Sequence, residues 1–161
     1  MKKLIYTLLI IIALTNNSFS AGTSSDSSDS SSNYTKAKNL IKAAKKYEKK
    51  GKTEKAQKKY AKAQKLLLKS NKEKPLQADT LNYLGFTTRK LGDYEKGEAF
   101  YLQGLKIEPN HNGINEYLGE LYIATNRMDL AKERLNILKS CDCKEYKQLK
   151  EIVEGTKKSK Y

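Results

Sequence analysis

The chain has 161 residues, enough for one ordinary domain, and carries a formal net charge of +14 at pH 7. It contains a single histidine and neither a glycine-rich phosphate loop nor a Ser-His-Asp order, so the sequence argues against an enzyme. The charge is one-sided: residues 35–74 hold 16 lysines and three glutamates, whereas residues 75–156 hold 11 basic and 13 acidic side chains. Such asymmetry is typical of a protein that meets an anionic partner or surface on one side.

Residues 1–20 have the layout of a secretory signal peptide. Lys2 and Lys3 precede an apolar run of about 11 residues, and Ser18 and Ser20 occupy the −3 and −1 positions of a cleavage site after Ser20. The run is shorter than the roughly 20 residues that a membrane-spanning helix needs. We therefore expect an exported protein, periplasmic or secreted and soluble after cleavage, with an uncleaved anchor as the alternative.

Residues 21–33 form a serine-rich segment that offers no apolar area to bury. Such a composition predicts a disordered linker between the signal peptide and the folded part. We expect the folded domain to span residues 34–157.

Small, aromatic and turn-forming residues recur in the same order three times in this domain. The clearest copy covers residues 78–111 and contains Leu84, Gly85, Gly92, Asp93, Tyr94, Tyr101 and Pro109. A shift of 34 residues toward the C-terminus finds Leu118, Gly119, Tyr122 and Ala131. A shift of 41 residues toward the N-terminus finds Ala44, Tyr47, Gly51, Ala56 and Tyr60. A period of this length indicates stacked helical repeats rather than the seven-residue period of a coiled coil.

This order resembles the tetratricopeptide repeat, whose 34-residue unit consists of two antiparallel helices. The resemblance covers about residues 37–143, with units at 37–77, 78–111 and 112–143 and a capping helix at 144–157. It departs from the family pattern at Thr88, which replaces a tyrosine, and at Gly97 and Gly104, which replace alanines. The resemblance implies an all-α fold, a right-handed superhelix of three helix pairs closed by the capping helix.

We expect helices at residues 34–50, 53–71, 76–91, 94–107, 112–125, 128–140 and 144–157. Gly51 and Gly92 should end the first helices of their units in a left-handed conformation, and Pro109 should stop the second helix of the middle unit. Gly85 and Gly119 are small where the first helix of each unit should cross the second.

His111 and the pair Cys141 and Cys143 are the remaining candidates for chemistry. His111 follows Pro109 in a turn, where a helix cap is the expected role. The two cysteines flank Asp142, and thiols of an exported protein tend to oxidise. An intramolecular bridge that pins the capping helix, reduced or intermolecular cysteines, and a thiolate site for Cu(I) all stay open.

The resemblance also implies that the first helix of each unit lines a concave groove. Matching offsets place ten residues there: Lys38, Lys45, Asp79, Asn82, Phe86, Arg89, Lys90, Glu116, Glu120 and Ile123. An exposed Phe86 beside Asn82 and Arg89 would give an extended peptide an apolar anchor and polar groups for its backbone.

These observations predict a non-enzymatic adaptor of the cell envelope that needs no cofactor and binds a protein or peptide segment in its groove. A binder of anionic lipid or polymer through the lysine-rich first unit is the alternative, and a thiol or copper protein using Cys141 and Cys143 is a third. Nucleic acid is not an expected partner, because arginine interleaved with stacking aromatics is missing. Neither the identity of the partner nor the oligomeric state follows from the sequence.

Overall fold

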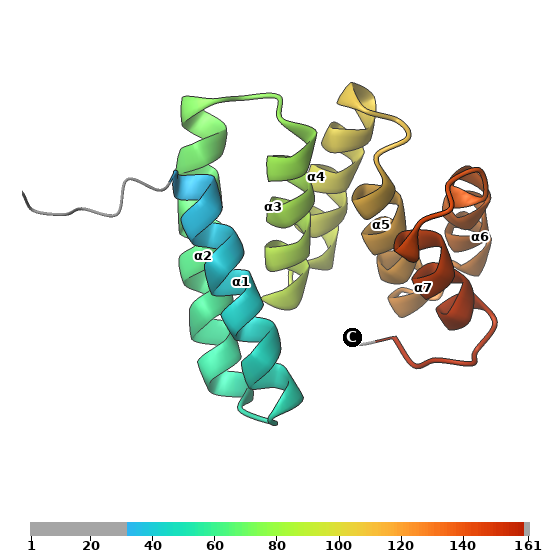
Figure 1. Ribbon diagram of the computed structural model, residues 1–161, viewed down its shortest axis with the longest axis horizontal. Coiled ribbons are helices and arrows are strands. Elements are labelled where there is room, and N and C mark those ends of the chain that lie inside the picture. Colours follow the sequence, from blue (N-terminus) through green and yellow to red (C-terminus); the bar gives the residue numbers. More distant parts are fainter. Residues whose placement is uncertain (1–31, 160–161) are drawn as a thin grey trace, which may run out of the picture. The chain divides into compact units, whose positions relative to one another are not determined.

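The computed structural model describes residues 32–159 (Figure 1). The chain divides into residues 1–30 and a helical unit of residues 31–161. The predicted signal peptide and all but the last two residues of the predicted linker lie outside the described residues. Of those two, Asn33 already belongs to the first helix.

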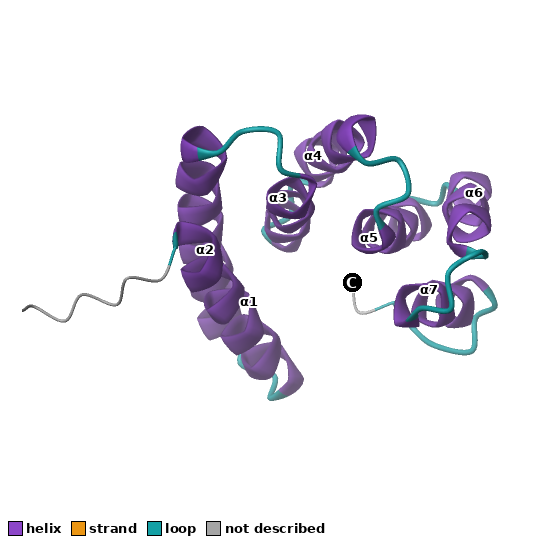
Figure 2. Cartoon of the chain, turned by 45° about the horizontal axis from the view of Figure 1, so that its top comes forward, coloured by secondary structure: helices purple, strands orange, loops and turns teal. Residues whose placement is uncertain are grey.

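The described residues form seven α-helices and no strand, which confirms the predicted all-α class. Their bounds are α1 (Asn33–Lys49), α2 (Thr53–Glu73), α3 (Ala78–Lys90), α4 (Tyr94–Ile107), α5 (Asn112–Ala124), α6 (Met128–Leu138) and α7 (Lys144–Val153). Within the helical unit, α1 pairs with α2, α3 with α4 and α5 with α6, while α7 packs against both α5 and α6. Figure 2 shows the three pairs following one another, as a helical solenoid requires.

The turns within the pairs explain why the predicted helix ends were nearly right. Gly51 and Gly92, which follow α1 and α3, have φ angles of 68° and 97°. Asn126 takes the same role after α5 with a φ of 58°, since asparagine tolerates the left-handed conformation better than most residues. The predicted end of α7 at residue 157 was wrong, because Gly155, with a φ of 72°, stops the helix soon after Val153.

Side-chain caps fix the starts of α4 and α5. The carboxylate of Asp93 accepts a hydrogen bond from the backbone N–H of Lys96 at 3.0 Å. The Nδ1 atom of His111 accepts one from the backbone N–H of Ile114 at 3.1 Å, so the role expected for this histidine is observed.

Close helix approach depends on glycine at two first-helix positions, but with different neighbours. A Cβ on Gly85 would lie only 2.5 Å from the fully buried ring of Tyr101, so α4 can approach α3 only because this residue is glycine. Gly119 instead makes room for Leu149 of α7, not for the second helix of its own unit as predicted. The capping helix is therefore packed like the first helix of a further unit.

The core contains two clusters of buried aliphatic and aromatic side chains. One cluster joins α1, α2 and α3 around Tyr60, Leu67 and Leu84, and a second joins α4, α5 and α6 around Tyr101 and Leu118. Within residues 32–159 no helix is both long and apolar enough to cross a membrane.

Candidate functional site

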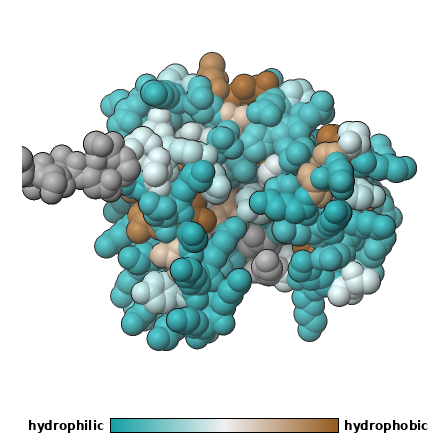
Figure 3. Space-filling view, in the orientation of Figure 1, coloured by the Kyte–Doolittle hydropathy of each residue, from teal (hydrophilic) through white to brown (hydrophobic). Residues whose placement is uncertain are grey.

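A cavity of about 450 Å³ opens between α1, α3, α5 and α7. Its walls are formed by Lys45, Glu48, Lys49, Thr53, Phe86, Lys90, Glu116, Tyr117, Glu120 and Gln148, and we call it the central cavity. Five of the ten residues predicted to line a groove lie in it: Lys45, Phe86, Lys90, Glu116 and Glu120. Figure 3 shows one face of the helical unit, which is mainly hydrophilic with small separate hydrophobic areas. The wall of the central cavity is both apolar and charged, because aromatic rings line it together with lysine and glutamate side chains.

Phe86 is buried in a cluster of aromatic rings and is not the exposed anchor that was predicted. Only 1% of its surface is exposed, and its ring centroid lies 5.7 Å from that of Tyr60 and 5.0 Å from that of Tyr117. The ammonium of Lys45 lies 4.4 Å from the centre of the Phe86 ring and donates to the hydroxyl of Tyr117 at 3.1 Å. A partner can reach Phe86 only through the central cavity, which this ring lines.

Arg89 and Glu120 form a buried ion pair and also depart from the prediction of exposed groove residues. Arg89 Nη2 lies 3.3 Å from Glu120 Oε2, and the two side chains are 0% and 6% exposed. Arg89 Nη1 also donates to the backbone carbonyl of Tyr117 at 2.7 Å. These contacts join α3 to α5, so Arg89 holds the second and third pairs together.

Lys90 and Glu48 form the corresponding link between α3 and α1. Their charged atoms lie 2.7 Å apart, and the hydroxyl of Tyr60 donates to the other oxygen of Glu48 at 2.8 Å. The side chain of Gln57 donates to the backbone carbonyl of Lys90 at 2.8 Å. Both ion pairs therefore connect neighbouring units across the wall of the central cavity.

Glu116 is a glutamate of the cavity wall whose carboxyl group has no partner among the described residues. It is only 4% exposed, and within residues 32–159 its carboxyl group forms neither a hydrogen bond nor an ion pair. Burial raises its pKa to about 8, and the charges of Glu120 and Glu145 add to this effect against those of Lys45 and Lys144. Glu116 is therefore mostly protonated at pH 7.

The other five predicted residues lie outside the central cavity. Lys38 is exposed and lies 5.2 Å from the ring centre of Tyr34. Asp79 is exposed and lies 3.3 Å from His111 Nε2. Asn82 and Arg89 are buried beneath the surface, and Ile123 packs half-buried against the second core cluster.

Tyr117 is the cavity residue whose importance the sequence analysis missed. A shift of 34 residues places it on Tyr83, an aromatic residue at the same position of the preceding unit. That repetition was visible in the sequence, but it falls outside the residues that define the family pattern.

A family model described as a tetratricopeptide repeat matches residues 78–111. The match covers α3 and α4, so this helix pair is a tetratricopeptide repeat. Proteins of this family are in general adaptors rather than enzymes. No curated protein matches the sequence significantly.

Solved structures of tetratricopeptide-repeat domains share the fold at low sequence identity. The translocator chaperone SycD of Yersinia enterocolitica type III secretion is 14% identical, with a TM-score of 0.54 over 73% of this chain and 81% of that one. The Sgt2 domain from Aspergillus fumigatus is 16% identical, with a TM-score of 0.55 over 74% and 78%. PcrH, crystallised with the chaperone binding region of PopD, is 16% identical, with a TM-score of 0.52 over 74% and 86%.

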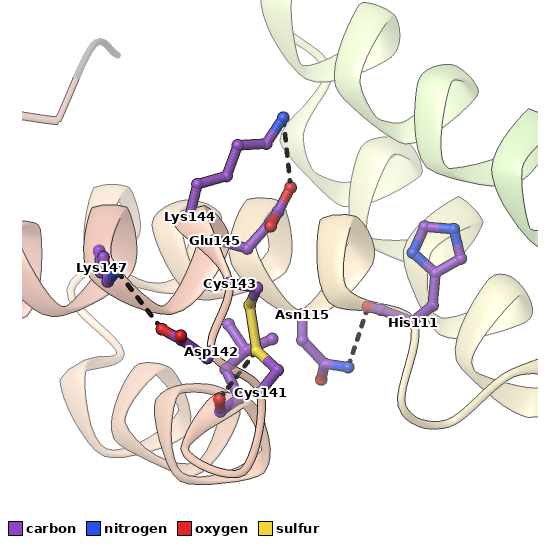
Figure 4. Close-up of a disulfide and its surroundings, with 9 residues drawn as sticks. His111, Asn115, Cys141, Asp142, Cys143, Lys144, Glu145 and Lys147 are labelled. Carbon is purple, nitrogen blue, oxygen red and sulfur yellow. Dashed lines mark hydrogen bonds and ion pairs between the residues drawn. A yellow bond between two sulfur atoms is a disulfide. The ribbon is translucent and has the colours of Figure 1, made fainter.

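The connection between α6 and α7 contains a disulfide between Cys141 and Cys143 (Figure 4). Their Cα atoms lie 5.2 Å apart, so of the alternatives left open the structure contains the intramolecular bridge. Asp142 between them forms an exposed ion pair with Lys147 of α7 at 3.4 Å. Among the described residues, no group of three or more His, Cys, Asp or Glu is placed to hold a metal ion.

Proposed function

We propose that this protein is a non-enzymatic interaction module that binds an extended peptide or protein segment in the central cavity. The observation that carries the proposal is the cavity itself: about 450 Å³ between the first helices of the repeats, with aromatic, cationic and anionic groups in its wall. Peptide grooves combine pockets for apolar side chains with polar groups that hold the backbone in register.

The proposed contacts differ from those expected from the sequence. Phe86 and Tyr117 line the cavity with their rings, and we call these two rings the aromatic floor. They would meet a side chain that enters the cavity rather than the peptide backbone. Lys49 and Thr53 are exposed at the wall on the α1 side, and Gln148 of α7 is half-buried at the opposite wall. These three residues would hold the backbone of the bound segment.

The cell envelope is the proposed site of action. Residues 1–20 have the layout of a signal peptide, and the disulfide between Cys141 and Cys143 fits an oxidising compartment. Both observations support export, and the oxidised bridge at the α6–α7 connection supports a folded domain that acts after export.

Replacing Gln148 with tryptophan should weaken peptide binding about tenfold or more, because the indole would occupy part of the central cavity. The probe is a phage library of random 12-residue peptides, selected on the full chain and re-measured as synthetic peptides by fluorescence anisotropy. Lys147→Trp is the matched control, since that neighbour is exposed and does not line the cavity. Peptides that bind wild type and Gln148→Trp equally well would show that the central cavity is not the binding site.

The lysine-rich first unit supports a second candidate, an anionic surface as the partner. Tyr47 and four lysines, Lys55, Lys58, Lys59 and Lys62, line a depression of about 270 Å³ on α1 and α2. This candidate predicts binding to vesicles that contain phosphatidylglycerol, with affinity falling steeply between about 50 and 200 mM salt. Binding to vesicles that does not change with salt, measured by co-sedimentation, would contradict it.

A further inference from the structure

The wall of the central cavity contains three carboxylates, and two of them already have cationic partners. Glu48 pairs with Lys90 at 2.7 Å, and Glu120 pairs with Arg89 at 3.3 Å. Glu116 lies in the same wall, more than nine-tenths buried, and has no such partner within residues 32–159. A buried carboxyl group without a donor is costly, so its retention at a cavity wall points to a ligand that supplies one.

None of the charged groups that act on Glu116 forms an ion pair with its carboxyl group within residues 32–159. Lys45 from α1 has the largest cationic effect on the pKa of Glu116, but its ammonium is engaged with the Tyr117 hydroxyl and the Phe86 ring. From α7, Lys144 and Glu145 act in opposite directions and form an ion pair with each other at 3.6 Å. Glu120, which lies on α5 like Glu116, adds negative charge, although Arg89 offsets part of it.

The aromatic floor beside Glu116 suits the stem of a long cationic side chain. The ring centroids of Phe86 and Tyr117 lie 5.0 Å apart, and both rings line the cavity together with Glu116. Lysine and arginine side chains place aliphatic carbons along apolar surface and carry the charge at the tip. The same floor already receives one ammonium, that of Lys45, against the Phe86 ring.

Resting on the proposed function, we propose that the bound segment inserts a lysine or arginine side chain into the central cavity and pairs its cationic group with Glu116. The partner is thus a peptide or protein segment that presents a lysine or arginine side chain. A charge-assisted hydrogen bond would form between the ammonium or guanidinium and the carboxylate. On binding near pH 7, the carboxyl proton of Glu116 passes to solvent, while the inserted cation keeps its own proton.

The test selects peptides from the random 12-residue library on the full chain at pH 8. One selected peptide that contains lysine is then synthesised, together with a copy in which norleucine replaces the lysine, and the affinities of the two peptides are compared. Norleucine keeps the aliphatic stem and removes the charge. We expect the replacement to weaken binding to wild type about tenfold or more and binding to Glu116→Gln much less. Glu95→Gln is the matched control and should keep the wild-type preference, because Glu95 is exposed on α4 and does not line the central cavity.

Titration calorimetry in buffers of different ionisation enthalpy supplies an independent readout. Wild type should release up to about one proton for each lysine peptide bound at pH 7, and Glu116→Gln should release none. The inference is overturned if the norleucine peptide binds wild type as tightly as the lysine peptide, or if Glu116→Gln keeps the full preference for lysine. If the inference fails but Gln148→Trp still weakens peptide binding, the proposed binding of peptides in the central cavity stands. If Gln148→Trp weakens the binding of no selected peptide, both the inference and the proposed function are overturned.

Discussion

Replacing Arg89 with methionine should lower the free energy of unfolding by about 3–5 kcal/mol, the usual cost of removing one partner of a buried ion pair. Arg89 and Glu120 are almost completely enclosed, so the substitution would remove the guanidinium that faces the buried carboxylate of Glu120 between α3 and α5. It would also remove the hydrogen bond to the Tyr117 carbonyl. Urea denaturation followed by circular dichroism measures the loss.

Two further variants make this prediction specific. Arg127→Met removes a similar pair, with Glu98, whose side chains are 37% and 20% exposed, and it should cost no more than about 1 kcal/mol. The double variant Arg89→Met with Glu120→Leu should recover part of the loss, since it leaves no buried charge behind. A loss at Arg89 no larger than the loss at Arg127 would refute the structural role assigned to this ion pair.

Replacing Glu116 with glutamine should remove a large pH dependence of stability. The pKa of Glu116 is raised to about 8 in the folded protein, first by burial and then by the charges of Glu120 and Glu145. In the unfolded chain the group titrates near pH 4.3, so between these values only the unfolded state gives up the proton. The contribution of Glu116 to the free energy of unfolding is therefore fully present below about pH 4 and is lost as the pH rises from there through 8.

The expected size follows from the separation of the two pKa values. At about 1.4 kcal/mol for each pKa unit, wild type should lose on the order of 4 kcal/mol between pH 5 and pH 9 through this group. Glu116→Gln should be more stable than wild type at pH 8 and should lack this slope. Glu95→Gln, on the exposed side of α4, should follow the wild-type curve. Parallel curves for wild type and Glu116→Gln would contradict a buried, unpaired carboxyl group.

The helices could be predicted closely because their ends are determined by local chemistry. Gly51 and Gly92 take positive φ angles, and Asp93 and His111 cap helix starts, all within a few residues of the boundary they determine. The end of α7 was misplaced because the prediction carried the helix past Gly155, whose positive φ angle stops it soon after Val153.

The site could be predicted only in part, because its geometry depends on contacts between units. Matching offsets identified the first helices and brought five residues to the central cavity, but they could not show that Phe86 packs against Tyr117. The pairing of Arg89 with Glu120 has the same origin, since it depends on how closely α5 approaches α3. Sequence spacing gives the face of a helix, whereas burial on that face is decided by the neighbouring unit.

The most direct measurement of the central claim is photo-cross-linking of a selected 12-residue peptide, carrying a benzophenone group, to the full chain, with the adducts located by mass spectrometry. Binding in the central cavity predicts adducts at Lys49, Tyr117 and Gln148, which line its walls. Adducts confined to the lysines of the first unit, such as Lys58 and Lys62, with the cavity residues unlabelled, would contradict the account.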